Sequence, residues 1–179
     1  RQDPYMRSHP LSRDRLRALK GLVAGASAQT APDPAADYWF ARAKGKLTAF
    51  TRAPSWTLRR ADSSGSADIA QMRKAVAYHR QSDLGRALSN IDAAISARPN
   101  DPFLRELKGQ ILLESRRASD AVKVYSAAAR LAPREPLILG GLGRAQLAAG
   151  NAQDALKTLE AARGRDFSDT RILRDLATA

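Results

Sequence analysis

The chain has 179 residues, of which 44% are hydrophobic and 6% aromatic, and it carries a net charge of +12 without any cysteine. The lack of cysteine excludes a disulfide scaffold, a cysteine-ligated zinc site and a thiol nucleophile. The basic residues are scattered and lack the interleaved aromatic side chains of a stacking surface, so we do not expect a nucleic-acid partner. No apolar run approaches the roughly 18 residues that a membrane-spanning helix needs.

The first predicted helix begins after Pro10-Leu11, with Ser12 as its N-cap. Its apolar stripe follows helical spacing and consists of Leu16, Leu19 and Val23. Residues 25–34 are predicted to form a loop between the two helices.

A second helix is predicted to begin at Asp33-Pro34, where aspartate can cap the helix and proline can occupy its first turn. Its predicted apolar stripe consists of Phe40, Ala43, Leu47 and Phe50. Pro54 is predicted to end this helix, and residues 61–67 read as a linker because of their serine and glycine content.

From residue 68 onward the sequence repeats with a period of 34. Each aligned column holds one kind of side chain: small at 75, 109 and 143, alanine at 87, 121 and 155, bulky at 91, 125 and 159, and alanine again at 94, 128 and 162. Pro99 and Pro133 form one further column, which Phe167 breaks in the third copy. Proline cannot continue a helix interior, so this column marks where helices end.

These columns resemble the tetratricopeptide (TPR) signature. The resemblance implies an all-α fold, a TPR-type α-solenoid of helix-turn-helix repeats at 68–101, 102–135 and 136–169. Gly150-Asn151 and Ser82-Asp83 supply turns within the repeats, and Arg116-Arg117 is a poorer turn pair at the same place. Residues 170–179 start a fourth repeat or form a capping helix; we favour a repeat cut short, because the end lacks the polar face that a cap needs.

By the same resemblance, the second, fifth, ninth, twelfth and thirteenth positions of each repeat line a concave groove that binds proteins or peptides. Here the predicted groove residues are Met72, Val76, His79, Arg80, Phe103, Glu106, Gln110, Leu113, Glu114, Arg144, Leu147, Arg171 and Arg174. Chaperone-binding TPR domains place lysine and asparagine where Met72 and Val76 stand, so we do not expect capture of a carboxy-terminal tail. Some of these side chains could instead pack in the core or face solvent.

The segment before the repeats contains Ser8-His9-Pro10-Leu11 followed by Arg15-Leu16. This motif, ahead of a TPR array, resembles the end of the catalytic domain in periplasmic HtpX-like zinc metallopeptidases. The resemblance implies that residues 1–60 are the tail of a peptidase domain with bridging helices. It also implies a parent protein in the bacterial periplasm that holds zinc and serves outer-membrane protein quality control.

The family's zinc site needs His-Glu-x-x-His, and neither histidine of this chain, His9 or His79, is followed by glutamate. We therefore expect no catalytic residue, no metal site and no cofactor within the chain itself. His9 is either a structural residue before a turn or a contributor to the active-site rim of the intact protein. The alternatives for the whole are a stand-alone TPR adaptor and, less favoured, a basic nucleic-acid binder.

Overall fold

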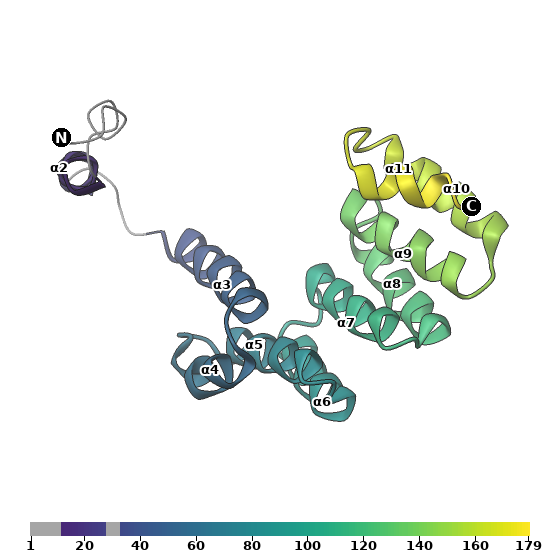
Figure 1. The fold of residues 1–179 in the computed structure, drawn as a ribbon, viewed down its shortest axis with the longest axis horizontal. Helices are drawn as coiled ribbons and strands as arrows, with labels where there is room; N and C mark the ends of the chain where they lie inside the picture. Colours follow the sequence, from purple (N-terminus) through teal and green to yellow (C-terminus); the bar gives the residue numbers. More distant parts are fainter. Residues whose placement is uncertain (1–11, 28–32) are drawn as a thin grey trace, which may run out of the picture. The chain divides into compact units, whose positions relative to one another are not determined.

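The computed structural model describes residues 12–27 and 33–179, and every regular element in these ranges is a helix (Figure 1). The chain divides into two compact units, Arg1–Tyr38 and Trp39–Ala179. Helix α2 (Ser12–Ser27) lies in the first unit, and α3 (Pro34–Thr51) crosses the boundary. The predicted Ser8-His9-Pro10-Leu11 motif, with His9, lies outside the described residues.

The remaining elements belong to the second unit. They are α4 (Pro54–Arg60), the short 3-10 helix η1 (Ala61–Ser63), α5 (Ala67–Arg80), α6 (Leu84–Ala97), α7 (Pro102–Glu114), α8 (Ala118–Leu131), α9 (Pro136–Ala148), α10 (Ala152–Arg163) and α11 (Thr170–Leu176).

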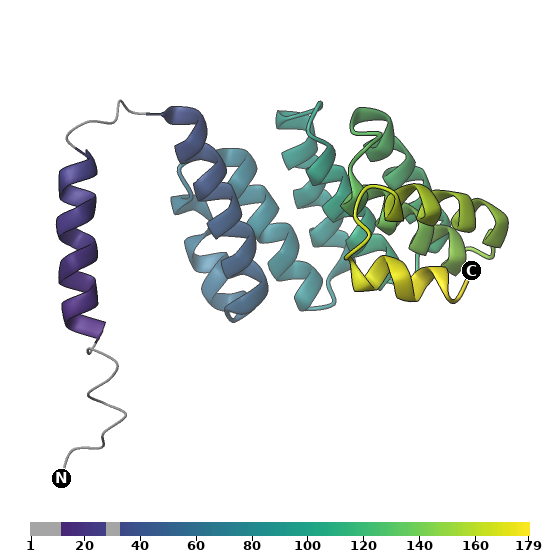
Figure 2. The same cartoon turned by 90° about the horizontal axis from the view of Figure 1, so that it is seen from above.

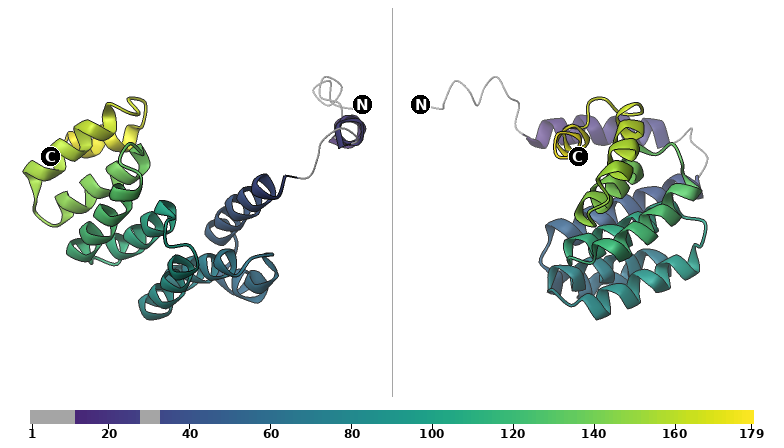
Figure 3. Two further views of the ribbon diagram at one scale, coloured as in Figure 1. Left: turned by 180° about the vertical axis from the view of Figure 1, so that it is seen from behind. Right: turned by 90° about the vertical axis from the view of Figure 1, so that its right-hand side faces the viewer.

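Helices α5–α6, α7–α8 and α9–α10 form three successive pairs, each packed on the next in chain order (Figures 2 and 3). The first helices of the pairs begin at residues 67, 102 and 136, and α11 begins at 170, so the spacing stays close to 34. This arrangement confirms the predicted all-α, TPR-type solenoid of three repeats and a further helix. We call α3, α5, α7, α9 and α11 the A helices.

Each pair is held together by a small residue on its first helix and a bulky one on its second. A Cβ added to Gly109 would lie 2.6 Å from ring carbons of Tyr125, and one added to Gly143 would lie 2.5 Å from Cγ of Leu159. Both bulky side chains are buried, as is Ile91, which occupies the same column. The small-and-bulky columns of the sequence therefore mark the places where paired helices approach most closely.

Helices α3 and α4 add a pair that the sequence reasoning missed. Helix α3 begins at Pro34, one period before residue 68, and Thr57 of α4 is fully buried one period before Ile91. Helix α3 ends at Thr51, before Pro54 as predicted, but Pro54 also begins α4, a helix that the sequence did not predict. The predicted linker at 61–67 is also shorter than expected: η1 fills its first half, Ala61 is fully buried, and α5 begins at Ala67.

The predicted apolar stripe on α3 is wrong as well. Phe40 and Leu47 are 70% and 65% exposed, whereas Arg42, Gly45 and Ala49 are buried. A Cβ on Gly45 would lie 3.1 Å from Cγ2 of Ile69 on α5, so glycine lets α3 approach α5 closely. The buried face of α3 is thus built from small residues and one paired arginine.

On α2, the two members of the predicted stripe that can be assessed, Leu19 and Val23, are both more than half exposed. The helix also continues to Ser27, beyond the predicted start of the loop at Gly25.

The turns between paired helices share one backbone conformation. Ser82, Arg116 and Gly150, spaced by one period, all have positive φ angles, of 60°, 60° and 82°. Only glycine adopts this left-handed conformation without steric cost. The Arg116 turn is therefore strained, in line with the prediction that Arg116-Arg117 forms a poor turn.

Candidate functional site

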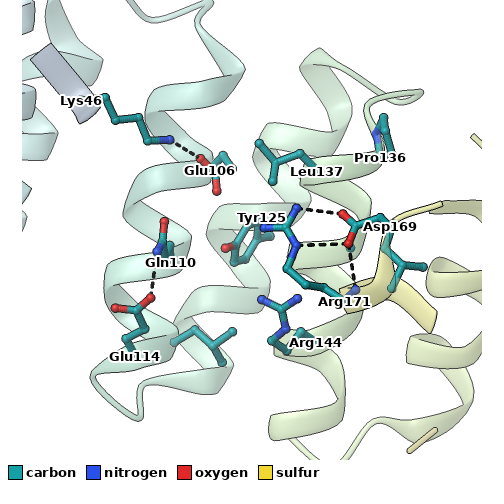
Figure 4. A pocket seen from close by; sticks show the side chains of 14 residues that line it. Lys46, Glu106, Gln110, Glu114, Tyr125, Pro136, Leu137, Arg144, Asp169 and Arg171 are labelled. Atoms are coloured by element: carbon teal, nitrogen blue, oxygen red, sulfur yellow. Dashed lines mark hydrogen bonds and ion pairs between the residues drawn. The ribbon is translucent and has the colours of Figure 1, made fainter. Parts of the chain in front are cut away.

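The A helices line two pockets that adjoin one another. The larger one, of about 370 Å³, is formed by α3, α7, α8, α9 and α11 and is called here the charged pocket (Figure 4). Its lining residues are Lys46, Glu106, Gln110, Leu113, Glu114, Tyr125, Pro136, Leu137, Gly140, Gly141, Arg144, Asp169, Arg171 and Ile172.

The second pocket, of about 280 Å³, lies between α3, α5 and α7 and is called the apolar pocket. Its lining is mainly aromatic and aliphatic and consists of Trp39, Arg42, Ala43, Lys46, Met72, Phe103 and Leu107. Lys46 lines both pockets. The two pockets therefore adjoin at this residue, and we call them together the A-helix groove.

Lys46 stands at the junction of the two pockets. Its Nζ lies 3.1 Å from Oε2 of Glu106, and the Glu106 side chain is only 7% exposed. A buried carboxylate needs a charged or hydrogen-bonded partner, and Lys46 supplies one. This ion pair ties α3 to α7 across the groove.

A second ion pair fixes α3 to the start of α7. The guanidinium of Arg42 donates two hydrogen bonds to the Asp101 carboxylate, and both residues are buried. Asp101 also caps α7 by accepting from the backbone N–H groups of Phe103 and Leu104. Burial alone would raise the pKa of Asp101, but the bonds and charge of Arg42, helped by these N–H groups, lower it below its usual 3.8.

The two sides of the charged pocket have opposite net charges, and each also holds one counter-charge: Lys46 pairs with Glu106 and Asp169 pairs with Arg171. Helix α7 contributes the carboxylates of Glu106 and Glu114, while α9 and α11 contribute the guanidinium groups of Arg144 and Arg171 (Figure 4). The Nε of Arg144 donates to Asp175 Oδ2 at 2.8 Å, which ties α9 to α11.

Asp169 holds Arg171 in place at the start of α11. Its carboxylate accepts from Nε at 3.1 Å and from Nη2 at 2.8 Å of Arg171, and from the Arg171 backbone N–H at 2.8 Å. The side-chain bonds from Arg171 are the main reason that the pKa of Asp169 falls to about 2. Both groups therefore remain charged over the physiological pH range.

Tyr125 of α8 stands between α7 and α9 and reaches the charged pocket (Figure 4). Tyr125 is only 3% exposed. Gly109 and Gly141 leave room for its ring, because a Cβ at either position would collide with it. Burial, followed by the charge of Glu106, raises the pKa of the phenol. Its hydroxyl makes no hydrogen bond to any residue in the described ranges, so it is open to a ligand in the pocket.

The structure brings most of the predicted groove residues to one surface. Six line the charged pocket and two line the apolar pocket: Glu106, Gln110, Leu113, Glu114, Arg144 and Arg171 in the first, and Met72 and Phe103 in the second. His79 lies beside them, with Nε2 at 2.6 Å from Oε2 of Glu114.

Four predicted groove residues lie elsewhere or are engaged in the fold. Val76 is fully buried, and Leu147 packs against the core around Leu159. Arg80 donates to the backbone carbonyl groups of Ala49 and Arg52 near the end of α3. Arg174 is largely exposed, with Nε 3.8 Å from Asp175. These side chains pack in the core, bond to the backbone or face solvent, and the sequence analysis had named core packing and solvent exposure as alternatives to the groove.

Several lining residues were missed by the sequence reasoning. Lys46 stands 34 residues before Arg80 and 68 before Glu114, so extending the period upstream would have placed it in the groove. Leu137 occupies the second position of its repeat and follows the same rule. Tyr125 and Asp169 gave no such signal, because one lies on a second helix and the other precedes α11.

Two further properties concern only residues 12–27 and 33–179. No helix in these ranges combines the length and hydrophobicity needed to cross a bilayer. They also contain no group of three or more His, Cys, Asp or Glu side chains placed to hold a metal ion.

Solved structures share this architecture. The chain is similar to the first TPR of Spaghetti (RPAP3) bound to the HSP90 peptide SRMEEVD, with 16% identity over 62% of this chain and 90% of that one, and a TM-score of 0.58. It is similar to MamA from Desulfovibrio magneticus RS-1, with 19% identity, coverages of 78% and 81%, and a TM-score of 0.62. PilF of Pseudomonas aeruginosa has 15% identity, coverages of 79% and 68%, and a TM-score of 0.62.

A comparison with curated protein sequences found no match. Two family models described as tetratricopeptide repeat match the chain, one over residues 40–102 and the other over residues 112–177. The first match begins at residue 40, so it includes the larger part of α3 and all of α4. The repeats in the sequence, the paired helices and these matches agree: the chain carries a tetratricopeptide-repeat region.

Proposed function

We propose that the A-helix groove binds a peptide segment of a partner protein and that the chain acts as a protein-interaction module. The observation that carries this proposal is that the apolar and charged pockets adjoin at Lys46. An apolar pocket can take a bulky side chain, and adjacent polar groups can fix the orientation of the segment. The fold is similar to TPR domains solved with HSP90 and HSP70 peptides, which supports this role by analogy.

Selection from a library of random short peptides tests this function directly. We expect enriched peptides to lose most of their affinity for a Phe103→Ala variant, because Phe103 lines the apolar pocket and is partly exposed. Leu156→Ala is the matched control, since Leu156 is an exposed apolar residue on α10. Equal loss in both variants, or no enrichment at all, would contradict a peptide-binding groove.

For the parent protein, we propose a bacterial periplasmic zinc metallopeptidase whose substrate or envelope-assembly partner is held by this groove. Support comes from Ser8-His9-Pro10-Leu11 with Arg15-Leu16 ahead of the repeats. Binding near a catalytic domain would raise the effective concentration of substrate there. The zinc and its ligands would belong to the rest of the parent, with outer-membrane protein quality control as its task. A stand-alone TPR adaptor fits the same groove.

An antibody raised against the chain distinguishes these two parents. Detection of a native protein well above 19.4 kDa, with proteolysis that stops on zinc chelation, is the result expected for the peptidase. A native protein of about the size of the chain, without such activity, would leave the adaptor.

A further inference from the structure

The two sides of the charged pocket offer different groups to a ligand. On the α7 side, Oε1 of Glu106 makes no bond to another described residue, and Glu114, whose side chain is 49% exposed, accepts from Gln110 and contacts Nε2 of His79. On the opposite side, Nη1 of Arg144 and of Arg171 is likewise unused among the described residues. The pocket therefore keeps acceptors on one side and cationic donors on the other.

The charges that line the pocket cancel. Lys46, Arg144 and Arg171 are matched by Glu106, Glu114 and Asp169. A segment of one charge sign would gain from one side of the pocket and be repelled by the other. The arrangement favours a ligand whose own charges are separated in the opposite sense.

Tyr125 adds a neutral group between the two sides. Its side chain is buried, its hydroxyl makes no hydrogen bond to another described residue, and the side chain lines the pocket. The hydroxyl lies at the wall of the pocket, so a bound segment can form a hydrogen bond with it. The phenol can donate to a backbone carbonyl or a carboxylate of the bound segment.

From these features we infer that the charged pocket selects a mixed-charge peptide segment, with a basic side chain facing Glu106 and Glu114 and an acidic side chain facing Arg144 and Arg171. This inference rests on the proposed peptide-binding function and specifies its ligand. The apolar pocket on the other side of Lys46 receives a neighbouring apolar side chain of the same segment.

The test uses the peptides enriched from the random library, measured by fluorescence anisotropy against the full chain. We expect the enriched peptides to carry both a basic and an acidic residue. Glu114→Lys should weaken binding by about three- to fivefold, as loss of a partly exposed ion pair does. Replacing the basic residue of the peptide with glutamate should restore binding to that variant but not to the unaltered chain.

Arg171→Glu should give the reciprocal result with the acidic residue of the peptide. Because Arg171 also binds Asp169, Arg171→Gln serves as a second variant that introduces no new repulsion. Glu160→Lys and Arg130→Glu are matched controls on exposed positions of α10 and α8, and both should leave the affinity unchanged.

The outcomes separate the inference from the function on which it rests. Enriched peptides of a single charge sign that still depend on Phe103 would overturn the inference and retain the groove. Mixed-charge peptides unaffected by the substitutions at 114 and 171 would overturn it too. Absence of any enriched peptide would overturn both.

Discussion

Arg42 on α3 and Asp101 at the start of α7 form a buried ion pair with two hydrogen bonds, although 59 residues separate them in the chain. The Arg42 guanidinium also lies 5.1 Å from the centre of the Trp39 ring, at the edge of the apolar pocket. The pair therefore connects the first helix pair of the second unit to the groove-lining helix α7.

Arg42→Met should destabilise the chain by about 3–5 kcal/mol, because it removes both side-chain hydrogen bonds to the buried Asp101 carboxylate and leaves only the longer contact with Arg98 at 3.9 Å. Urea unfolding followed by circular dichroism measures the change. The control is Arg117→Met, which removes an exposed pair with Asp120 and should cost less than about 1 kcal/mol. Similar losses from both substitutions would show that the buried pair contributes no more than a surface one.

Gly109→Ala should destabilise by about 1–3 kcal/mol, because the added methyl group would press on the Tyr125 ring. In the double variant Gly109→Ala/Tyr125→Ile, which copies the Ala75 and Ile91 pair of the preceding repeat, we expect part of the loss to be recovered. Thermal unfolding of the two single variants and the double variant measures the coupling.

Gly85→Ala is the control for this series, since a Cβ there meets only an oxygen of Asp83 at 3.8 Å. It should stabilise by up to about 1 kcal/mol through helix propensity. Strictly additive effects of the substitutions at 109 and 125 would argue against direct contact between the two positions.

Arg116→Gly should stabilise the chain by about 0.5–1 kcal/mol. Glycine relieves the left-handed conformation at φ 60°, and this gain exceeds the added entropy of the unfolded chain. Ser115→Gly is the neighbouring control: its φ is −88°, so glycine brings only the entropic cost and should destabilise. Melting temperatures of the two variants decide the matter, and a loss at both positions would contradict the assigned turn strain.

Acid should release α11 before it unfolds the core. The pKa of Asp169 is about 2 in the folded chain, below its usual 3.8, so its contribution to stability is complete above 3.8 and is lost as the pH falls toward 2. Hydrogen exchange of α11 amides between neutral pH and pH 2 measures this release. Asp169→Asn should reduce the pH dependence of α11 exchange in this window, after correction for the intrinsic pH effect.

Asp101 adds to acid sensitivity at the other end of the groove. Its pKa is also lowered in the folded chain, so its pair with Arg42 stabilises above the usual pKa and is lost as the pH falls below it. After correction for the intrinsic pH effect, slower exchange of the α11 amides at pH 2 than at neutral pH would contradict the sign for Asp169, and slower exchange of the first-turn amides of α7 would contradict it for Asp101.

The period of 34 was enough to predict the three helix pairs, because the small and bulky columns record direct contacts such as Gly143 with Leu159. It failed upstream, where α4 has seven residues and Thr57 replaces a bulky side chain, so the pair α3–α4 lacks most of the signature. The apolar pattern of α3 was misleading because Arg42 pairs inside while Phe40 stays exposed.

The sequence predicted groove residues only from their position within each repeat. The rule located Glu106, Glu114 and Arg144, but it could not show that Arg80 is engaged by carbonyl groups of α3. It also gave no reason to place the Tyr125 hydroxyl in the pocket, since that depends on two glycines on neighbouring helices. The positions of these side chains depend on contacts between neighbouring repeats, which the sequence of a single repeat does not reveal.

The most direct test of the central claim is an NMR titration of the isotopically labelled chain with an enriched peptide. A peptide in the A-helix groove should shift the amide signals of residues near the two pockets on α3, α7, α9 and α11 and leave α6 and α10 largely unchanged. Shifts concentrated on α6 and α10, with the groove residues unaffected, would contradict the claim.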